Sequence, residues 1–88
     1  DFGELKSELK KLSDFYDHSL IVEKNSMRQL TLNCLKEDGF RIIEIGFRPT
    51  AENFAKEFYF YFKDKGFNVK NIWVYETPNN CATYSEMR

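Results

Sequence analysis

The sequence predicts an α+β fold, and three observations support that prediction. Apolar residues recur at helical spacing over residues 4–16 and again after residue 50. Two runs rich in β-branched or aromatic residues, Arg41–Phe47 and Asn71–Tyr75, indicate strands. The resulting order of elements (helix, helix, strand, helix, strand, strand) is typical of the α+β class.

The first helix is expected over residues 4–16, because its apolar residues lie on one face: Leu5, Leu9, Leu12 and Phe15 or Tyr16. Asp1 stands three residues before Glu4, which is a loose form of the capping box. The helix is expected to end near residues 17–19. The short apolar run Leu20–Val22 that follows has the composition of a strand.

Residues 26–37 fit two patterns. Leu30, Leu32 and Cys34 alternate as in a strand, whereas the wider spacing of apolar residues fits a helix. Ser26 as an N-cap and Gly39 as a stop favour a short helix. Arg41–Phe47 is then expected as a strand that Pro49 closes.

The second long helix is expected to begin at Thr50, which is a good N-cap, and to end at Gly66. Its apolar face consists of Ala51, Phe54, Ala55, Phe58 and Phe62. Aromatic residues also occupy its other faces, and a helix that is apolar on several sides requires cover on more than one of them. Residues 71–84 are expected to form an antiparallel hairpin, because Thr77–Asn80 has the Pro and Asn content of a turn.

Composition excludes several classes of protein. The 88 residues include 13 basic and 14 acidic side chains without a basic block, which argues against binding to nucleic acid. No apolar run approaches the roughly 20 residues that span a bilayer. Two cysteines and no targeting signal suggest a cytoplasmic protein. Nine Phe, five Tyr and one Trp exceed what one small core holds, so subunit contacts are expected.

Four local motifs resemble, in order, those of the 6-pyruvoyl-tetrahydropterin synthase / 6-carboxytetrahydropterin synthase family. They are Asp1-Phe2-Gly3-Glu4-Leu5-Lys6, Tyr16-Asp17-His18, Pro49-Thr50-Ala51-Glu52-Asn53 and Val74-Tyr75-Glu76-Thr77-Pro78. Each motif alone is weak, but the four together cover nearly the whole chain at compatible spacing. The resemblance implies that residues 1–88 are the C-terminal part of a single pterin synthase-like domain.

The resemblance also implies a fold, an assembly and an activity. The fold is the tunnelling fold, an antiparallel sheet with two long helices on one face, of which the first two strands are missing from this chain. Subunits of the family form a homo-hexamer or trimer. The intact parent enzyme is expected to be a zinc-dependent lyase acting on 7,8-dihydroneopterin triphosphate, in tetrahydropterin or queuosine-precursor biosynthesis.

The same resemblance assigns roles to four residues. Asp17 and His18 look like the family's catalytic acid–base pair, although a His at a helix end also complements the helix dipole. Glu76 looks like the glutamate that anchors the pterin, although a strand-end Glu can simply face solvent. Glu52 complements the dipole of its helix or makes a second pterin contact.

Cysteine and histidine content separate this chain from an intact enzyme. The chain has one His, so the three-histidine zinc site and the catalytic cysteine of the family are expected outside it. The 88 residues alone are therefore not expected to be an active enzyme. Cys34 is assigned to packing, whereas Cys81 is either a packed thiol or a neighbour of the Glu76 pocket. Two alternatives stay open: a non-catalytic relative that binds a pterin or purine, and an oligomeric interaction module.

Overall fold

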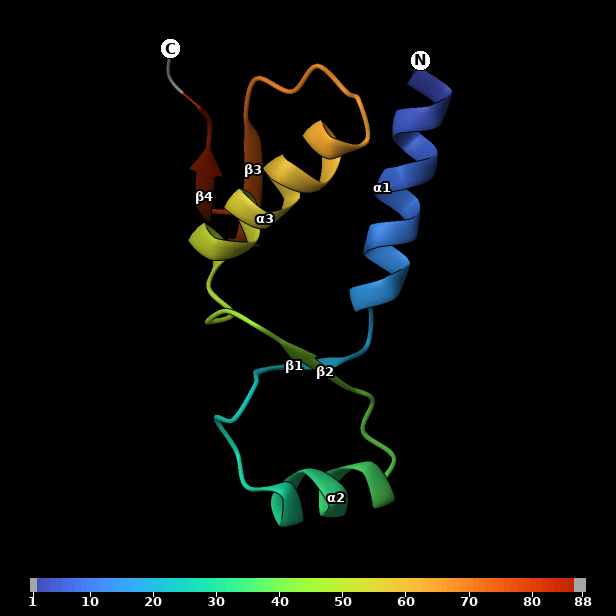
Figure 1. Ribbon diagram of the computed structural model, residues 1–88, viewed down its shortest axis with the longest axis vertical. Helices are drawn as coiled ribbons and strands as arrows, with labels where there is room; N and C mark the ends of the chain where they lie inside the picture. The colour runs from blue at the N-terminus through green and yellow to red at the C-terminus, as the bar shows by residue number, and fades with distance from the viewer. Residues whose placement is uncertain (1, 87–88) are drawn as a thin grey trace. The chain divides into compact units, whose positions relative to one another are not determined.

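A computed structural model describes residues 2–86, so Asp1 and its part in the expected capping box lie outside the described residues. The chain forms two compact units, residues 1–48 and residues 49–88 (Figure 1). Residues 2–86 contain three helices and two small sheets, as an α+β fold requires. Within the described range, no helix combines the length and apolar character that crossing a membrane would demand.

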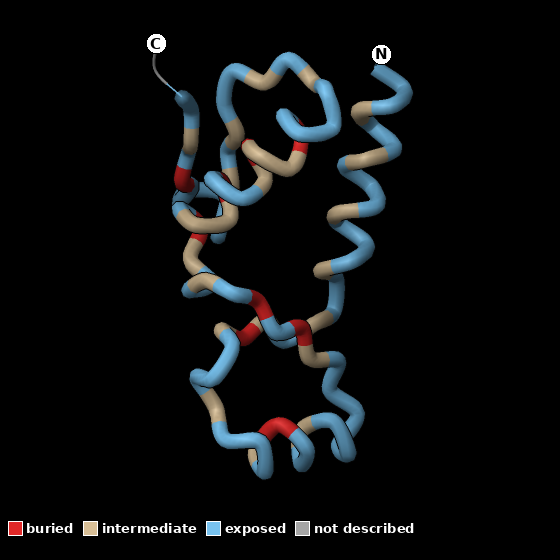
Figure 2. Tube along the Cα trace, viewed as in Figure 1, coloured by how far each residue is buried: buried red, intermediate tan, exposed pale blue. Residues whose placement is uncertain are grey.

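The first unit opens with helix α1, Phe2–Tyr16. Its charged flank contains salt bridges at helical spacing, Lys10 to Asp14 at 3.0 Å and Lys11 to Glu8 at 3.5 Å. Such exposed pairs contribute little stability. None of the residues of α1 is buried, and its trace is exposed or intermediate along its whole length (Figure 2). The predicted amphipathic helix is confirmed, but its apolar face is largely uncovered.

The rest of the first unit is a strand–helix–strand segment. Strand β1 (Leu20–Glu23) pairs with strand β2 (Ile42–Ile45) in parallel, with Leu20 opposite Ile42. Helix α2 (Gln29–Glu37) lies in the connection between them. The buried residues of these three elements are Val22, Leu32, Ile43 and Ile45. The helical interpretation of this segment is therefore confirmed over the strand alternative.

Two expectations for this segment are corrected by the structure. Residues 2–86 do not form the single antiparallel sheet that was expected. The connection from β1 to β2 contains a helix and brings the chain back to the end at which β1 began. Strand β2 therefore runs parallel to β1. Ser26 is not the N-cap of α2. Its hydroxyl donates to the carbonyl oxygen of Glu23 at 2.5 Å, and Arg28 occupies the cap position without a side-chain hydrogen bond.

Helix α3 (Ala51–Asp64) begins the second unit, with both ends as the sequence predicts. The hydroxyl oxygen of Thr50 accepts from the backbone N–H of Asn53 at 3.1 Å, which is N-cap geometry. After the helix, Gly66 has a φ of +93°, and its N–H donates to the carbonyl of Lys63 at 3.0 Å. A glycine is favoured there because a residue with Cβ is strained in the left-handed region.

Strands β3 (Ile72–Thr77) and β4 (Asn80–Tyr84) form the predicted antiparallel hairpin. One face of the hairpin packs against α3 (Figure 1). The buried residues of this unit are Ala51, Ala55, Tyr59, Phe62 and Ala82. Trp73 and Tyr75 alternate with half-buried neighbours along β3 and are themselves exposed, so Trp73 is not part of the core.

Candidate functional site

A pocket of about 250 Å³ lies in the second unit, between the first turn of α3 and the turn end of the hairpin. The helix contributes Ala51 and Glu52 to its wall, and β3 contributes Glu76. Strand β4 completes the wall with Asn80, Cys81 and Ala82. The volume is slightly below the roughly 300–1,000 Å³ of pockets for drug-sized ligands.

Glu76 reaches this pocket because of two features of β3. Its neighbours Ile72 and Val74 are half-buried on the α3 side, and the two-residue period of a strand places Glu76 on that side as well. The hairpin register then shifts between Tyr75, opposite Cys81, and Thr77, opposite Asn80, which leaves Glu76 without a partner on β4. A bulge of this kind bends the strand and changes the direction of a side chain.

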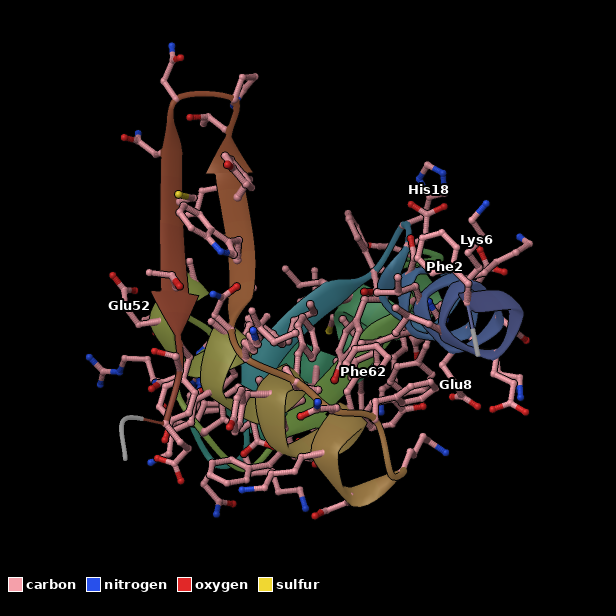
Figure 3. All side chains as sticks on the ribbon, turned by 90° about the horizontal axis from the view of Figure 1, so that it is seen from above. Phe2, Lys6, Glu8, His18, Glu52 and Phe62 are labelled. Atoms are coloured by element: carbon pink, nitrogen blue, oxygen red, sulfur yellow. The ribbon has the colours of Figure 1, made fainter. Side chains whose placement is uncertain are left out.

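Glu52 approaches the same pocket from the helix. It lies in the first turn of α3, where the backbone N–H groups make the helix end positive and favour carboxylates. Figure 3 shows Glu52 at this end of the helix. Residues 2–86 offer no ion pair to either Glu52 or Glu76, so both carboxylates remain available as hydrogen-bond acceptors.

The structure places three of the sequence's candidates in this one pocket, namely Glu52, Glu76 and Cys81. The thiol of Cys81 is exposed, so its interpretation as a neighbour of Glu76 is the one that the geometry favours. Asn80 was not anticipated as a wall residue, because the Asn-rich turn indicated only chain reversal. Cys34 is exposed on α2, which corrects its assignment to packing.

The other two candidates, Asp17 and His18, form a close pair in the first unit. Carboxylate Oδ2 of Asp17 lies 3.5 Å from Nε2 of His18. Consecutive side chains seldom converge, but His18 has a φ of +51°, and this left-handed conformation turns the chain sharply after α1. The imidazole is 93% exposed and extends away from the ribbon in Figure 3, so solvent or a ligand can reach it.

A cavity of about 420 Å³ adjoins His18. Ser19 and Leu20 line it from the start of β1, and Gly39, Phe40 and Arg41 line it from the segment before β2. The cavity therefore lies at the end of the parallel pair from which both strands start. Arg41 was expected only as the first residue of a strand, and nothing in the sequence indicated that it would lie beside His18.

The zinc site implied by the resemblance does not fit this chain. Three histidines would be needed, and the sequence contains only His18. Among residues 2–86 there is also no cluster of three His, Cys, Asp or Glu side chains that could hold a metal ion.

Comparison with known proteins identifies the family. The 6-carboxy-5,6,7,8-tetrahydropterin synthase of Rickettsia felis is 38% identical over 87 residues, which cover 90% of this chain and 61% of that protein. The enzyme of the same name from Aquifex aeolicus is 31% identical over 96 residues, covering 98% of this chain and 59% of the relative. No solved structure matches significantly.

The similarity extends along nearly the whole chain. This chain nevertheless spans only about three-fifths of the length of these two relatives, 61% and 59%. The match to the 6-pyruvoyl tetrahydropterin synthase family covers residues 1–87, which includes both carboxylates of the pocket and the Asp17–His18 pair. The chain belongs to the 6-pyruvoyl tetrahydropterin synthase family.

Proposed function

We propose that this chain provides the pterin-binding carboxylates and the acid–base pair of a pterin synthase-like lyase. The substrate is 7,8-dihydroneopterin triphosphate, and the reaction belongs to tetrahydropterin or queuosine-precursor biosynthesis. The observation that carries the proposal is the placement of Glu76 in a β-bulge, beside Glu52, in a pocket at the positive end of α3. Membership of the family and the names of the two relatives support it.

Glu76 is the proposed anchor of the pterin ring. The amino-pyrimidine edge of a pterin presents adjacent N–H donors, and a carboxylate offers two oxygens that accept two parallel hydrogen bonds. Charge-assisted pairs of this kind are about twice as strong as neutral hydrogen bonds. Glu52 lines the same pocket and supplies a second acceptor, while the helix end offsets the repulsion between the two carboxylates.

His18 is the proposed acid–base residue, with Asp17 as its partner. An imidazole exchanges protons readily near neutral pH. In the elimination, a C–H bond of the substrate side chain breaks, its proton passes to the imidazole, and its electron pair forms a carbon–carbon double bond. The C–O bond to the triphosphate breaks with its electron pair leaving on the triphosphate. The Asp17 carboxylate, 3.5 Å from Nε2, stabilises the imidazolium that forms.

The proposal extends to assembly and location. Five exposed large aromatics, Phe2, Phe15, Phe40, Trp73 and Tyr75, favour a homo-oligomer, a hexamer or trimer. Light scattering measures this directly. Two exposed, unpaired cysteines favour a reducing compartment and hence the cytoplasm. Residues 2–86 hold no set of three side chains that could bind the zinc of the parent enzyme, and the roles proposed above use side chains of this chain alone.

The decisive experiment is calorimetric titration of the protein with neopterin, before and after the change Glu76→Gln. The amide presents one acceptor and two donors where the pterin edge needs two acceptors, so one contact becomes donor against donor. Losing a charged hydrogen bond should weaken binding by about 1.5–3 kcal/mol. Glu52→Gln should weaken it by less, because Glu52 makes the secondary contact.

Glu57→Gln is the matched control, since Glu57 is an exposed carboxylate on α3 that does not line the pocket. It should leave neopterin affinity unchanged. Equal affinity of the Glu76→Gln variant and the wild type would contradict the proposal and return Glu76 to a solvent-facing role. Tight binding without any turnover by the whole protein would instead identify a non-catalytic pterin-binding relative.

A further inference from the structure

The turn that presents His18 is held in an unusual conformation. A φ of +51° is uncommon for residues other than glycine and persists only where surrounding contacts fix it. Yet the side chain of His18 is itself almost fully exposed. The contacts that fix the turn must therefore come from its neighbours.

Arg41 contacts both sides of this turn from 24 residues further along the chain. Before His18, its guanidinium Nη1 donates to the backbone carbonyl of Asp17 at 3.0 Å. After His18, the N–H of Leu20 donates to the backbone carbonyl of Arg41 at 2.8 Å. The guanidinium carbon also lies 5.6 Å from the ring centre of Phe15, in the last turn of α1.

Some of these contacts are made by the backbone of Arg41 and others by its side chain. The bond to Leu20 uses only the backbone carbonyl, and it belongs to the start of the parallel strand pair. The bond to Asp17 and the contact with Phe15 use the guanidinium, and they act on the chain just before His18. One local hydrogen bond also stabilises the same turn: the Ser19 hydroxyl donates to the Tyr16 carbonyl at 2.6 Å.

We propose that Arg41 is a positioning residue that holds the Asp17–His18 pair in place through the carbonyl of Asp17. The guanidinium suits this role because it is planar and always charged, so it donates to a carbonyl and stacks on an aromatic ring at once. Arg41 and His18 also line one cavity, so a ligand beside His18 would lie beside Arg41 too. This inference rests on the proposed acid–base role of His18.

The test compares Arg41→Met with Arg41→Lys. Methionine keeps an unbranched apolar stem and the backbone carbonyl but removes the donor, whereas lysine keeps a charge and a donor. Arg48→Met is the matched control, because Arg48 is an exposed arginine that pairs with Glu23 at 3.8 Å and does not line the cavity of His18.

The first readout is NMR of the turn. A strong intraresidue NOE between the amide and Hα protons of His18 marks its positive φ. Arg41→Met should weaken this NOE, Arg41→Lys should restore part of it, and Arg48→Met should leave it unchanged. Slow hydrogen exchange at the Leu20 amide should persist in every variant, since its acceptor is a backbone carbonyl. That result would show that strand pairing is intact.

The second readout is turnover by the whole protein. Misplacing a catalytic group by about 1 Å costs on the order of 100-fold in rate. Arg41→Met should therefore lower kcat by about 10- to 100-fold with little change in KM, and Arg41→Lys should recover part of the loss. An unchanged NOE, or an unchanged kcat despite a lost NOE, would overturn the inference.

The variant His18→Ala separates this inference from the function on which it rests. Loss of the imidazole in this variant should lower turnover by about 10²–10⁴-fold if His18 is the acid–base residue. Normal turnover in His18→Ala would overturn the acid–base proposal, while the NOE would still decide whether Arg41 holds the turn. Lost turnover in His18→Ala with normal turnover in Arg41→Met would overturn the role of Arg41 alone.

Discussion

Helices α1 and α3 are alike in sequence pattern but differ in what covers them. Both are amphipathic and of similar length, 15 and 14 residues. Helix α3 packs on the β3–β4 hairpin and buries four residues, whereas α1 buries none. Among the apolar side chains of α1, Phe2 is 74% exposed and Phe15 is 51% exposed. Two helices with the same helical spacing of apolar residues therefore differ in how far those residues are buried.

The difference shows what local sequence can and cannot specify. The hairpin that covers α3 follows it directly in the chain, so the three elements meet through contacts of short sequence separation. Within the first unit, by contrast, no residue of α1 is buried. An uncovered apolar face on a helix of this family is consistent with the proposed contacts between subunits.

The largest expected effect tests this contrast directly. Phe62 on α3 is 2% exposed, so Phe62→Ala should cost about 3–5 kcal/mol of unfolding free energy through lost burial and the cavity left behind. Phe15→Ala on α1 should cost far less, because half of that ring is already in solvent. Urea unfolding followed by far-UV circular dichroism reports on the helices of both units, and the fluorescence of Trp73, the single tryptophan, reports on the second unit.

The outcome also reports on association. If Phe15→Ala proved as costly as Phe62→Ala, and if the cost grew with protein concentration, α1 would be covered by another subunit in solution. Equal costs without any concentration dependence would contradict the contrast drawn between the two helices.

A smaller effect is expected from the helix caps, which also differ between the two units. Thr50 caps α3 through its hydroxyl, whereas Arg28 at the start of α2 makes no side-chain cap bond. Thr50→Ala should therefore cost about 1 kcal/mol, and Thr50→Ser should cost little because the hydroxyl remains. Arg28→Asp should stabilise the first unit by a similar amount, since it introduces a cap where none exists.

Far-UV circular dichroism during urea unfolding measures both changes. The midpoint should fall for Thr50→Ala and rise for Arg28→Asp. A lower midpoint for Arg28→Asp would mean that Arg28 makes a stabilising contact that outweighs a new cap.

The features that sequence analysis predicted correctly are those governed by neighbouring residues. The Thr50 cap, the Gly66 stop and the hairpin turn each depend on a few consecutive side chains. The direction of β2 depends instead on the path of the whole connection from β1, which contains α2. The family resemblance implied an antiparallel sheet, and a parallel pair is found.

In the candidate site, too, some features were predicted from neighbouring residues and others depend on residues far apart in the chain. Glu52, Glu76 and Cys81 were named from motifs and spacing, and the structure places them in one pocket. The bulge at Glu76 was not predicted, because a register shift depends on how two strands pair. Arg41 was missed for a similar reason, since its hydrogen bond to Asp17 joins residues 24 positions apart.

The smallest expected effect concerns Tyr84, at the end of β4. Partial burial raises the pKa of Tyr84 above its usual value near 10, and the Glu86 carboxylate raises it further by a smaller amount. The phenol donates to Oε2 of Glu86 at 3.0 Å, and this bond exists only while the phenol is protonated. The folded state therefore holds this proton more tightly than the unfolded state does.

The sign of the pH effect follows from that difference. Because the folded pKa is the higher one, the contribution of Tyr84 to stability is fully present below about pH 10 and is lost as the pH rises through the folded value. Tyr84→Phe removes this titration, so its urea midpoint should fall less steeply than that of the wild type above about pH 10. The slopes are the quantity to compare, because the substitution also removes the bond to Glu86 at every pH. Parallel slopes for the two proteins would contradict the raised pKa, whereas a steeper wild-type slope would locate the effect at the hairpin end of the second unit.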